Sequence, residues 1–294
     1  MTTGTEVVAT ADDLPPPVAA ALASPGPGED GAAHVAGRRW TFLRWGSPHD
    51  PPLLLVHGVT SNARTWWRVG PALAAAGRHV VAIDMPGHGP DATWDGRHRF
   101  VETAEGVAGY ISEIGLAAAG LAVVGHSWGG MVGAHLPQVG VRPVPLVLLD
   151  PPWLSLEQLK TLTLDPTEQR YDSLGQATSA VRAMHPNWSD GDVEAKAVAL
   201  TEFDGACVRA VLLQNGSWDA GMAALRHPDA AGLPVWLIRG DSSSGGLIPE
   251  TAMPAIRTQL EQVRVLTIAG GSHSPQRTHP EATVLAILRA LAKR

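Results

Sequence analysis

The sequence predicts an α/β protein in which helices cover both faces of a mainly parallel, doubly wound β-sheet. Apolar runs of strand type alternate with segments of helical periodicity over most of the 294 residues, a pattern typical of βαβ units. The strand pattern stops after residue 150 and resumes near residue 235. This interruption indicates a group of helices inserted between two strands of the sheet.

The first half of the chain supplies most of the expected sheet. Residues 1–30 are rich in Pro, Gly, Ala and acidic residues and show no apolar face, so we expect a flexible tail with at most one short helix near residues 18–22. A hairpin is expected over residues 34–45, with its turn at Gly37 and Arg38. Four continuous apolar runs then predict strands buried on both faces, at residues 53–56, 79–84, 121–125 and 146–150. Helices are expected over residues 66–76 and 100–114, and directly after residue 127.

The second half begins with the insertion, which follows the sixth expected strand. Five short helices are expected there, at residues 154–164, 171–185, 190–200, 205–214 and 220–225. Strands at 235–240 and 263–268 and a helix at 282–291 complete the sheet. We therefore divide the chain into a tail (1–30), a core (31–152 and 232–294) and a helical cap over the strand ends (153–231).

Composition narrows the class of protein. The net charge is −6, the isoelectric point is about 6.0 and there is no basic block, so we expect no nucleic-acid partner. No apolar run approaches the roughly 20 residues needed to span a bilayer, and the N-terminus lacks the features of a secretory signal. The single cysteine, Cys207, excludes an internal disulfide and suits a reducing compartment. We expect a cytoplasmic protein; the oligomeric state is left open.

The segment Gly125-His126-Ser127-Trp128-Gly129 lies where a predicted strand turns into a predicted helix. A serine on such a sharp turn has a strained backbone, and the two glycines are needed because side chains there would collide with the strand and the helix. The helix that begins here directs its first N–H groups at negative charge forming nearby. Ser127 therefore occupies a position typical of a nucleophile.

Four segments together make the chain resemble an α/β-hydrolase over roughly residues 34–294. They are Leu-Val-His-Gly at 55–58, Asp-Met-Pro-Gly-His-Gly at 84–89, Gly-His-Ser-Trp-Gly-Gly at 125–130 and Gly-Gly-Ser-His-Ser at 270–274. The resemblance is to the serine esterase or lactonase type with a helical cap. It implies Ser127 as nucleophile and His273 as its base, in the family's order of nucleophile, acid and histidine; His279 is a nearby rival.

The acid that orients the histidine has two candidates. In most relatives a glycine ends the strand after the cap, and the acid lies about three residues after that glycine. Here that position is Ser243. Asp241 lies two residues too early. The resemblance also offers the end of the strand after the nucleophile helix, where Asp150 precedes a stiff Pro-Pro turn. We favour Asp150 and keep Asp241 as the alternative.

The oxyanion that forms during acyl transfer needs two N–H donors. The resemblance implies the backbone N–H groups of Val59 and Trp128, with Gly58 allowing the close approach of the first. His57, Asp84, His88 and His126 are interpreted as structural residues. No spaced metal-binding motif is present and no phosphate-binding loop is found, so we expect neither a metal nor a cofactor.

The tryptophans give the sequence evidence on the chemical type of the substrate. The sequence has ten, against three phenylalanines and two tyrosines. Several fall near the predicted cleft, and we expect Gly58, Trp66, Trp153, Trp188 and Trp218 to contact substrate, with Trp67 and Trp128 close by. This concentration favours a hydrophobic substrate, aromatic compounds included.

These features together predict a serine hydrolase that cleaves a small-molecule carboxylic ester or lactone through an acyl-enzyme. The resemblance implies that epoxide and haloalkane hydrolases of this fold use a carboxylate nucleophile, so Ser127 argues against those reactions. The alternatives are C–C bond hydrolysis or perhydrolysis with the same residues, or a ligand-binding sensor with little turnover.

Overall fold

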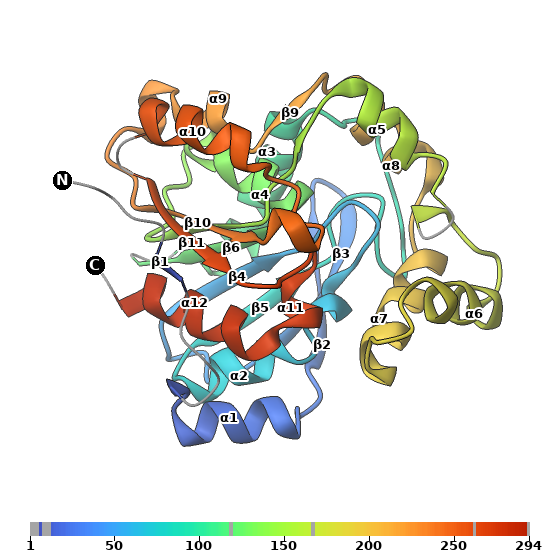
Figure 1. Ribbon diagram of the computed structural model, residues 1–294. Helices are drawn as coiled ribbons and strands as arrows, with labels where there is room; N and C mark the ends of the chain where they lie inside the picture. Colours follow the sequence, from blue (N-terminus) through green and yellow to red (C-terminus); the bar gives the residue numbers. More distant parts are fainter. Residues whose placement is uncertain (1–5, 8–12, 118–119, 166–167, 261–262, 293–294) are drawn as a thin grey trace.

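A single nine-stranded sheet organises the described part of the chain, which in this computed structural model comprises residues 6–7, 13–117, 120–165, 168–260 and 263–292. The strand order is β1-β11-β10-β7-β6-β4-β5-β3-β2 (Figure 1). Strands from β1 to β5 in that order pair in parallel, whereas β3 and β2 are antiparallel. The strands are β1 (Glu6–Val7), β2 (Glu29–Val35), β3 (Arg38–Trp45), β4 (Pro52–Val56), β5 (His79–Ile83), β6 (Ala122–His126), β7 (Leu146–Leu149), β10 (Val235–Gly240) and β11 (Val263–Ile268). The predicted mainly parallel sheet is confirmed.

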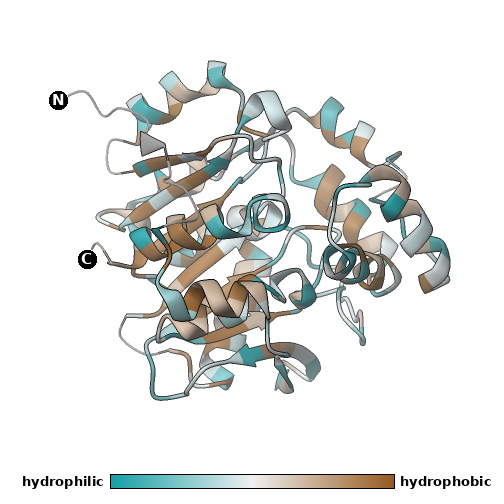
Figure 2. Cartoon of the chain, turned by 60° about the horizontal axis from the view of Figure 1, so that its bottom comes forward, coloured by the Kyte–Doolittle hydropathy of each residue, from teal (hydrophilic) through white to brown (hydrophobic). Residues whose placement is uncertain are grey.

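Helices cover both faces of the sheet because its central strands are apolar on both sides. In β4, Leu54 and Val56 belong to one core cluster, and Leu53 and Leu55 to the other. Figure 2 shows apolar strands in the middle of the molecule, with helices of mixed hydropathy around them. The first cluster is covered by α3 (Phe100–Glu113), α4 (Trp128–His135) and α10 (Met253–Gln259), and the second by α1 (Pro16–Ala23), α2 (Val69–Ala75) and α12 (Pro280–Ala292).

The N-terminal segment differs from the expected flexible tail. Leu14, Val18 and Leu22 recur every four residues and are buried in the second cluster, so this face of α1 packs against α2 and α12. Residues 6 and 7 also pair with β11. This apolar face was not recognised in the sequence because Pro and Ala dominate the composition of the segment. Residues 1–5 and 8–12 of the expected tail lie outside the described residues.

The elements of the insertion between β7 and β10 are β8 (Trp153–Leu154), α5 (Leu156–Leu162), α6 (Leu174–Met184), α7 (Asp190–Thr201), α8 (Gly205–Gln214), β9 (Trp218–Asp219) and α9 (Met222–Leu225). The part of the insertion that holds α5 to α8 lies beyond the carboxyl ends of the parallel strands (Figure 1), whereas α9 packs beside α4. Side chains of Ser155, Ser173, Ser189 and Asp204 accept hydrogen bonds from the first turns of four of these helices and fix where they begin. The β8–β9 pair joins the two ends of the insertion.

Short helical turns make up the connections near the site. The expected helix at 66–76 is divided into η2 (Ala63–Trp66) and α2, and α11 (Pro275–Thr278) precedes the last helix. The other turns are η3 (Leu136–Val139), η5 (Pro228–Ala230), η6 (Ser242–Ser244) and η7 (Glu250–Ala252). Among the helices described, none is long and apolar enough to cross a membrane.

Candidate active site

Ser127 lies between β6 and α4 with φ 53° and ψ −121°, a conformation that non-glycine residues rarely adopt. A Cβ on Gly125 would lie 2.2 Å from the carbonyl oxygen of Gly129, and one on Gly129 would lie 2.4 Å from that of Val56. Both glycines are therefore required by contact with backbone. Ser127 is only 5% exposed, so its hydroxyl faces an internal cavity instead of open solvent.

A chain of hydrogen bonds joins Ser127 to His273 and Asp150. Ser127 Oγ lies 3.0 Å from His273 Nε2, and His273 Nδ1 lies 2.7 Å from Asp150 Oδ2. Because the carboxylate can only accept, His273 carries its proton on Nδ1 and leaves Nε2 free to accept from the serine hydroxyl. This is the tautomer that a general base for Ser127 requires.

The Asp150 carboxylate is completely buried and held by backbone donors. Gly240 N donates to its Oδ1 at 2.9 Å, and Leu247 N donates to its Oδ2 at 3.0 Å. The residue itself has a φ of 42°, in the left-handed region. Such a strained position persists only where surrounding contacts fix it, and here they direct the carboxylate at His273.

The alternative acid, Asp241, lies elsewhere. It caps η6 by accepting from Ser243 N at 2.9 Å, and it also accepts from Gly270 N at 3.3 Å. The hydrogen bond from the Ser243 hydroxyl is the largest cause that lowers the pKa of the Asp241 carboxyl, and the two N–H donors lower it further. Of the two aspartates, Asp150 is the one that the structure brings to His273. His279, the rival histidine, contacts the Thr278 hydroxyl.

The loop that carries His273 is fastened to the residue before the nucleophile. His126 Nε2 donates to the His273 carbonyl at 2.8 Å, and the two rings are 4.9 Å apart. The Gln276 amide lies 3.4 Å from His126 Nδ1 on the other side of the ring. Burial lowers the pKa of His126 well below its usual value, which keeps the ring neutral. The sequence indicated a structural His126 but not this contact.

The expected oxyanion loop passes directly over the serine. A Cβ on Gly58 would lie 3.2 Å from Ser127 Cβ, a tight contact, so glycine lets the loop approach this closely without displacing the serine. Val59 follows on the cavity wall, and its carbonyl accepts from His88 Nε2 at 2.5 Å. Trp128 opens α4, so its N–H is among the helix donors without an intrahelical partner.

The other polar residues in the segments that resemble α/β-hydrolases stabilise loops. His57 Nε2 accepts from Met85 N at 3.0 Å, while its Nδ1 lies 2.7 Å from the Gly58 carbonyl. Asp84 accepts from Ala63 N at 2.7 Å and so fixes the start of η2. No group of three His, Cys, Asp or Glu side chains suited to a metal ion occurs among the described residues.

A cavity of about 530 Å³ opens in front of Ser127 and His273, between the strand ends and the insertion. Of the residues expected to contact substrate, Gly58, Trp188 and Trp218 line this cavity. Trp66 does not: it is fully buried in the second core cluster on the other side of the sheet. Trp153 packs at the edge of the first cluster and is likewise absent from the described cavity wall.

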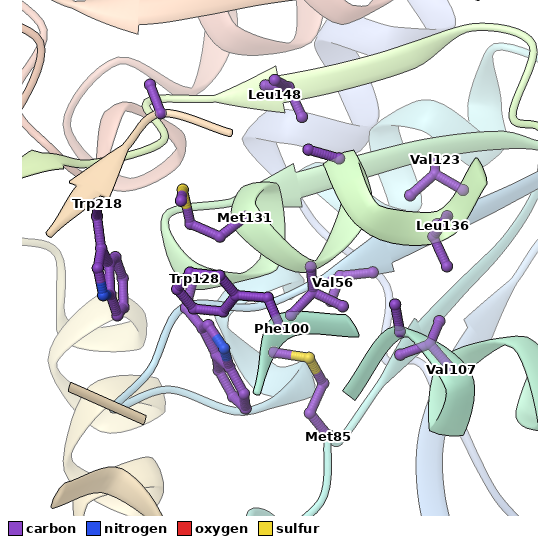
Figure 3. Packing of buried hydrophobic residues seen from close by; sticks show 14 of the residues in the cluster. Val56, Met85, Phe100, Val107, Val123, Trp128, Met131, Leu136, Leu148 and Trp218 are labelled. Atoms are coloured by element: carbon purple, nitrogen blue, oxygen red, sulfur yellow. The ribbon is translucent and has the colours of Figure 1, made fainter. Parts of the chain in front are cut away.

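Two further tryptophans have structural positions. The Trp128 ring is buried next to Met131 and Val56 beneath the turn (Figure 3), so only its backbone faces the site. The Trp67 indole donates to Asp192 in α7 at 3.0 Å. It therefore links the insertion to the core.

The cavity wall also contains two buried cations that the sequence interpretation missed. Arg277 lies in α11, four residues after His273, and Lys196 lies in α7. Both side chains are more than nine-tenths buried. Lys196 was detectable as the only cation among the mostly apolar residues 193–200, whereas no local pattern marks Arg277.

A serine hydrogen-bonded to a histidine at the carboxyl edge of a doubly wound sheet, facing a cavity under inserted helices, is the arrangement expected of an α/β-hydrolase site. The chain belongs to the Alpha/beta hydrolase family, whose pattern matches residues 53–287.

Curated relatives of this family differ in their named activities. The chain is 29% identical to Serine hydrolase-like protein of Homo sapiens over 60% of this chain and 85% of that protein. It is 29% identical to Epoxide hydrolase A of Mycobacterium tuberculosis over 68% of this chain. The chain spans 63% of that epoxide hydrolase, and 29% of an acetyltransferase component of an acetoin cleaving system from Pseudomonas putida.

Solved structures agree on the fold. E-2-(Acetamidomethylene)succinate hydrolase superposes with a TM-score of 0.73 at 20% identity, covering 90% of this chain and 99% of that chain.

Proposed function

We propose that this protein is a serine hydrolase that cleaves a carboxylic ester or lactone through an acyl-enzyme. The observation that carries the proposal is the linear arrangement of Ser127, His273 and Asp150, with 3.0 Å between Ser127 Oγ and His273 Nε2 and 2.7 Å between His273 Nδ1 and Asp150 Oδ2. A hydroxyl is a poor nucleophile at neutral pH and needs such a base.

In the first half-reaction, Ser127 Oγ attacks the acyl carbon while its proton passes to His273 Nε2. Asp150 stabilises the imidazolium that results. The carbonyl oxygen becomes an oxyanion, for which the N–H groups of Val59 and Trp128 are the proposed donors. The bond to the alcohol oxygen then breaks, and that oxygen takes the proton from His273.

In the second half-reaction, His273 takes a proton from water as the water oxygen attacks the acyl-enzyme. The ester bond to Ser127 breaks, the proton returns to Ser127 Oγ, and the carboxylic acid leaves. With a lactone, the alcohol and the acid are released as one hydroxy acid. The cavity of about 530 Å³ has the size of a small-molecule site.

One relative is named an epoxide hydrolase, but epoxide opening in this fold is expected to use a carboxylate at the nucleophile position. Ser127 occupies that position here. The serine therefore favours acyl transfer.

The test is labelling with a fluorophosphonate, followed by a panel of esters, lactones, amides and C–C substrates, with Ser127→Ala as the control. We expect rapid labelling of the native protein, none of the variant, and turnover of esters or lactones that the variant lacks. A folded Ser127→Ala variant that keeps most of the hydrolytic rate would refute the proposal. Slow labelling with tight ligand binding would indicate a sensor.

A further inference from the structure

Arg277 is the feature of the cavity that the proposed chemistry leaves unexplained. The residue is 6% exposed and lines the cavity from α11. Nη1 donates to the Asp192 carbonyl at 2.7 Å and Nη2 to the Thr65 hydroxyl at 2.9 Å. A guanidinium has five N–H donors, and the others have no partner among the described residues.

The charge of Arg277 lacks a direct counter-ion. No carboxylate of the described residues forms an ion pair with it, and the nearest acid on α7, Asp192, is committed to the Trp67 indole, the Ser189 hydroxyl and Arg68. Lys196, by contrast, is paired with Glu168 at 3.1 Å. Burial lowers the pKa of Arg277 to about 10, and the nearby charges of Asp192 and Glu168 offset part of that effect, so the guanidinium remains cationic at neutral pH. Burying a cation without a direct ion pair is costly, and an anionic group of a ligand in the cavity would supply that pair.

The position of Arg277 is also fixed by an aromatic ring. Its guanidinium carbon lies 4.8 Å from the centre of the Trp188 ring, and Trp188 stacks on His185 at 3.8 Å. All three residues line the same cavity as Ser127. A guanidinium held over a ring by its carbon can still direct free N–H groups at an anion.

We infer that Arg277 and Trp188 form an anion-binding subsite of the cavity, and that the substrate carries a carboxylate remote from the bond that is cleaved. The identity of the reacting group rests on the proposed function, whereas the anion site does not. Glu168 and Asp165 also line the cavity, so the opposite preference, for a cationic substrate, must be part of the test.

The first experiment uses the unmodified protein and three p-nitrophenyl esters of similar length. They are the mono-ester of adipic acid, the uncharged heptanoate, and an ester with a terminal ammonium group. We expect kcat/KM to be about 10- to 100-fold higher for the carboxylate ester than for the heptanoate, through KM, as for a charge-assisted hydrogen bond. An equal or lower value, or a preference for the ammonium ester, would overturn the inference.

The second experiment compares Arg277→Gln with Arg68→Gln. Arg68 also joins core to insertion, since it donates to the Ser189 hydroxyl at 2.9 Å and stacks on Trp67, but it is absent from the described cavity wall. Arg277→Gln should abolish the preference for the carboxylate ester, Arg277→Lys should restore part of it, and Arg68→Gln should leave it unchanged. A folded Arg277→Gln variant with the native preference would refute the subsite.

A binding measurement separates this inference from the proposed function. Calorimetry with the Ser127→Ala variant compares monomethyl adipate with methyl heptanoate, and neither needs to be hydrolysed. We expect the half-ester to bind more tightly, and the addition of Arg277→Gln to weaken only the half-ester, by about 10- to 100-fold. Arg277-dependent binding in a protein without esterase activity would contradict the proposed function alone. Esterase activity with equal binding of both compounds would contradict the anion site alone.

Discussion

Replacing Asp150 with Asn is the perturbation that best tests how the site works, because the amide cannot satisfy all three groups that the carboxylate serves. Oδ1 accepts from Gly240 N, and Oδ2 accepts from both Leu247 N and His273 Nδ1. If the amide nitrogen takes the Oδ2 position, it meets two donors. His273 must then move its proton to Nε2, which is the wrong tautomer for accepting from Ser127. If the amide is flipped, its nitrogen opposes Gly240 N instead.

The expected loss has two parts. An unsatisfied buried N–H costs about 1–3 kcal/mol of stability in either orientation. Turnover should fall far more, by about 10⁴-fold, as the same replacement does in a well-studied serine protease. The charge partner of the imidazolium is lost in both orientations, and the required tautomer is lost in the first. The stability loss is too small to explain such a fall in rate when activity is expressed per folded molecule.

The assay is ester hydrolysis at neutral pH, with folded fraction determined by urea unfolding. Asp241→Asn is the matched control, since it makes the same chemical change in an exposed carboxylate that caps η6. It should retain turnover within a few-fold of the native protein. If Asp241→Asn were inactive and Asp150→Asn active, the geometric argument would be wrong.

Three further predictions concern the cavity, the fold and pH. Trp188→Ala should change the ratio of kcat/KM between charged and neutral esters at least tenfold while reducing the free energy of unfolding by only about 1–2 kcal/mol; a variant that is merely less stable, with native preference, would contradict this. Gly125→Ala should destabilise the protein by about 3 kcal/mol in a thermal unfolding assay, because its Cβ would lie 2.2 Å from a backbone atom. Gly175→Ala in α6 is the control: its Cβ would meet nothing within 4 Å, so the variant should be neutral or slightly stabilising. Burial lowers the pKa of His57 and His126 well below the usual value, so below about pH 6.5 the unfolded chain binds protons that the folded chain does not. The free energy of unfolding should therefore fall as pH decreases, by up to about 1.4 kcal/mol per pH unit for each histidine. Urea titrations showing no such fall would refute the assignment of neutral rings.

The sequence predicted the parts of the site that depend on strand ends. The β6 turn at Ser127 and the end of β7 at Asp150 are marked by apolar runs that stop at a polar residue, so their place at the sheet edge follows from the parallel order. The direction in which a side chain points in the loop after a strand was harder to predict. Trp66 and Trp67 are consecutive, yet the first is buried on the far side of the sheet and the second contacts α7, because η2 ends between them.

Packing between distant segments was also outside the reach of the sequence. Arg277 contacts Thr65 and Asp192, which lie 212 and 85 residues away. Its burial depends on how the insertion folds back over the strand ends, and no local pattern encodes that.

The register of the sheet explains why a carboxylate on β7 can serve His273. Strands β6 and β7 are neighbours, and His126 is paired with Leu149, so Ser127 and Asp150 follow paired residues and leave the sheet side by side. Strand β10 lies on the other side of β7, and the N–H of its last residue, Gly240, points at Asp150. A Cβ on Gly240 would lie 2.5 Å from the Ser272 carbonyl, so this glycine also lets the His273 loop approach. The segment after β10 therefore shapes the site through its backbone, which explains how Asp241 can cap a turn there while the orienting carboxylate comes from β7.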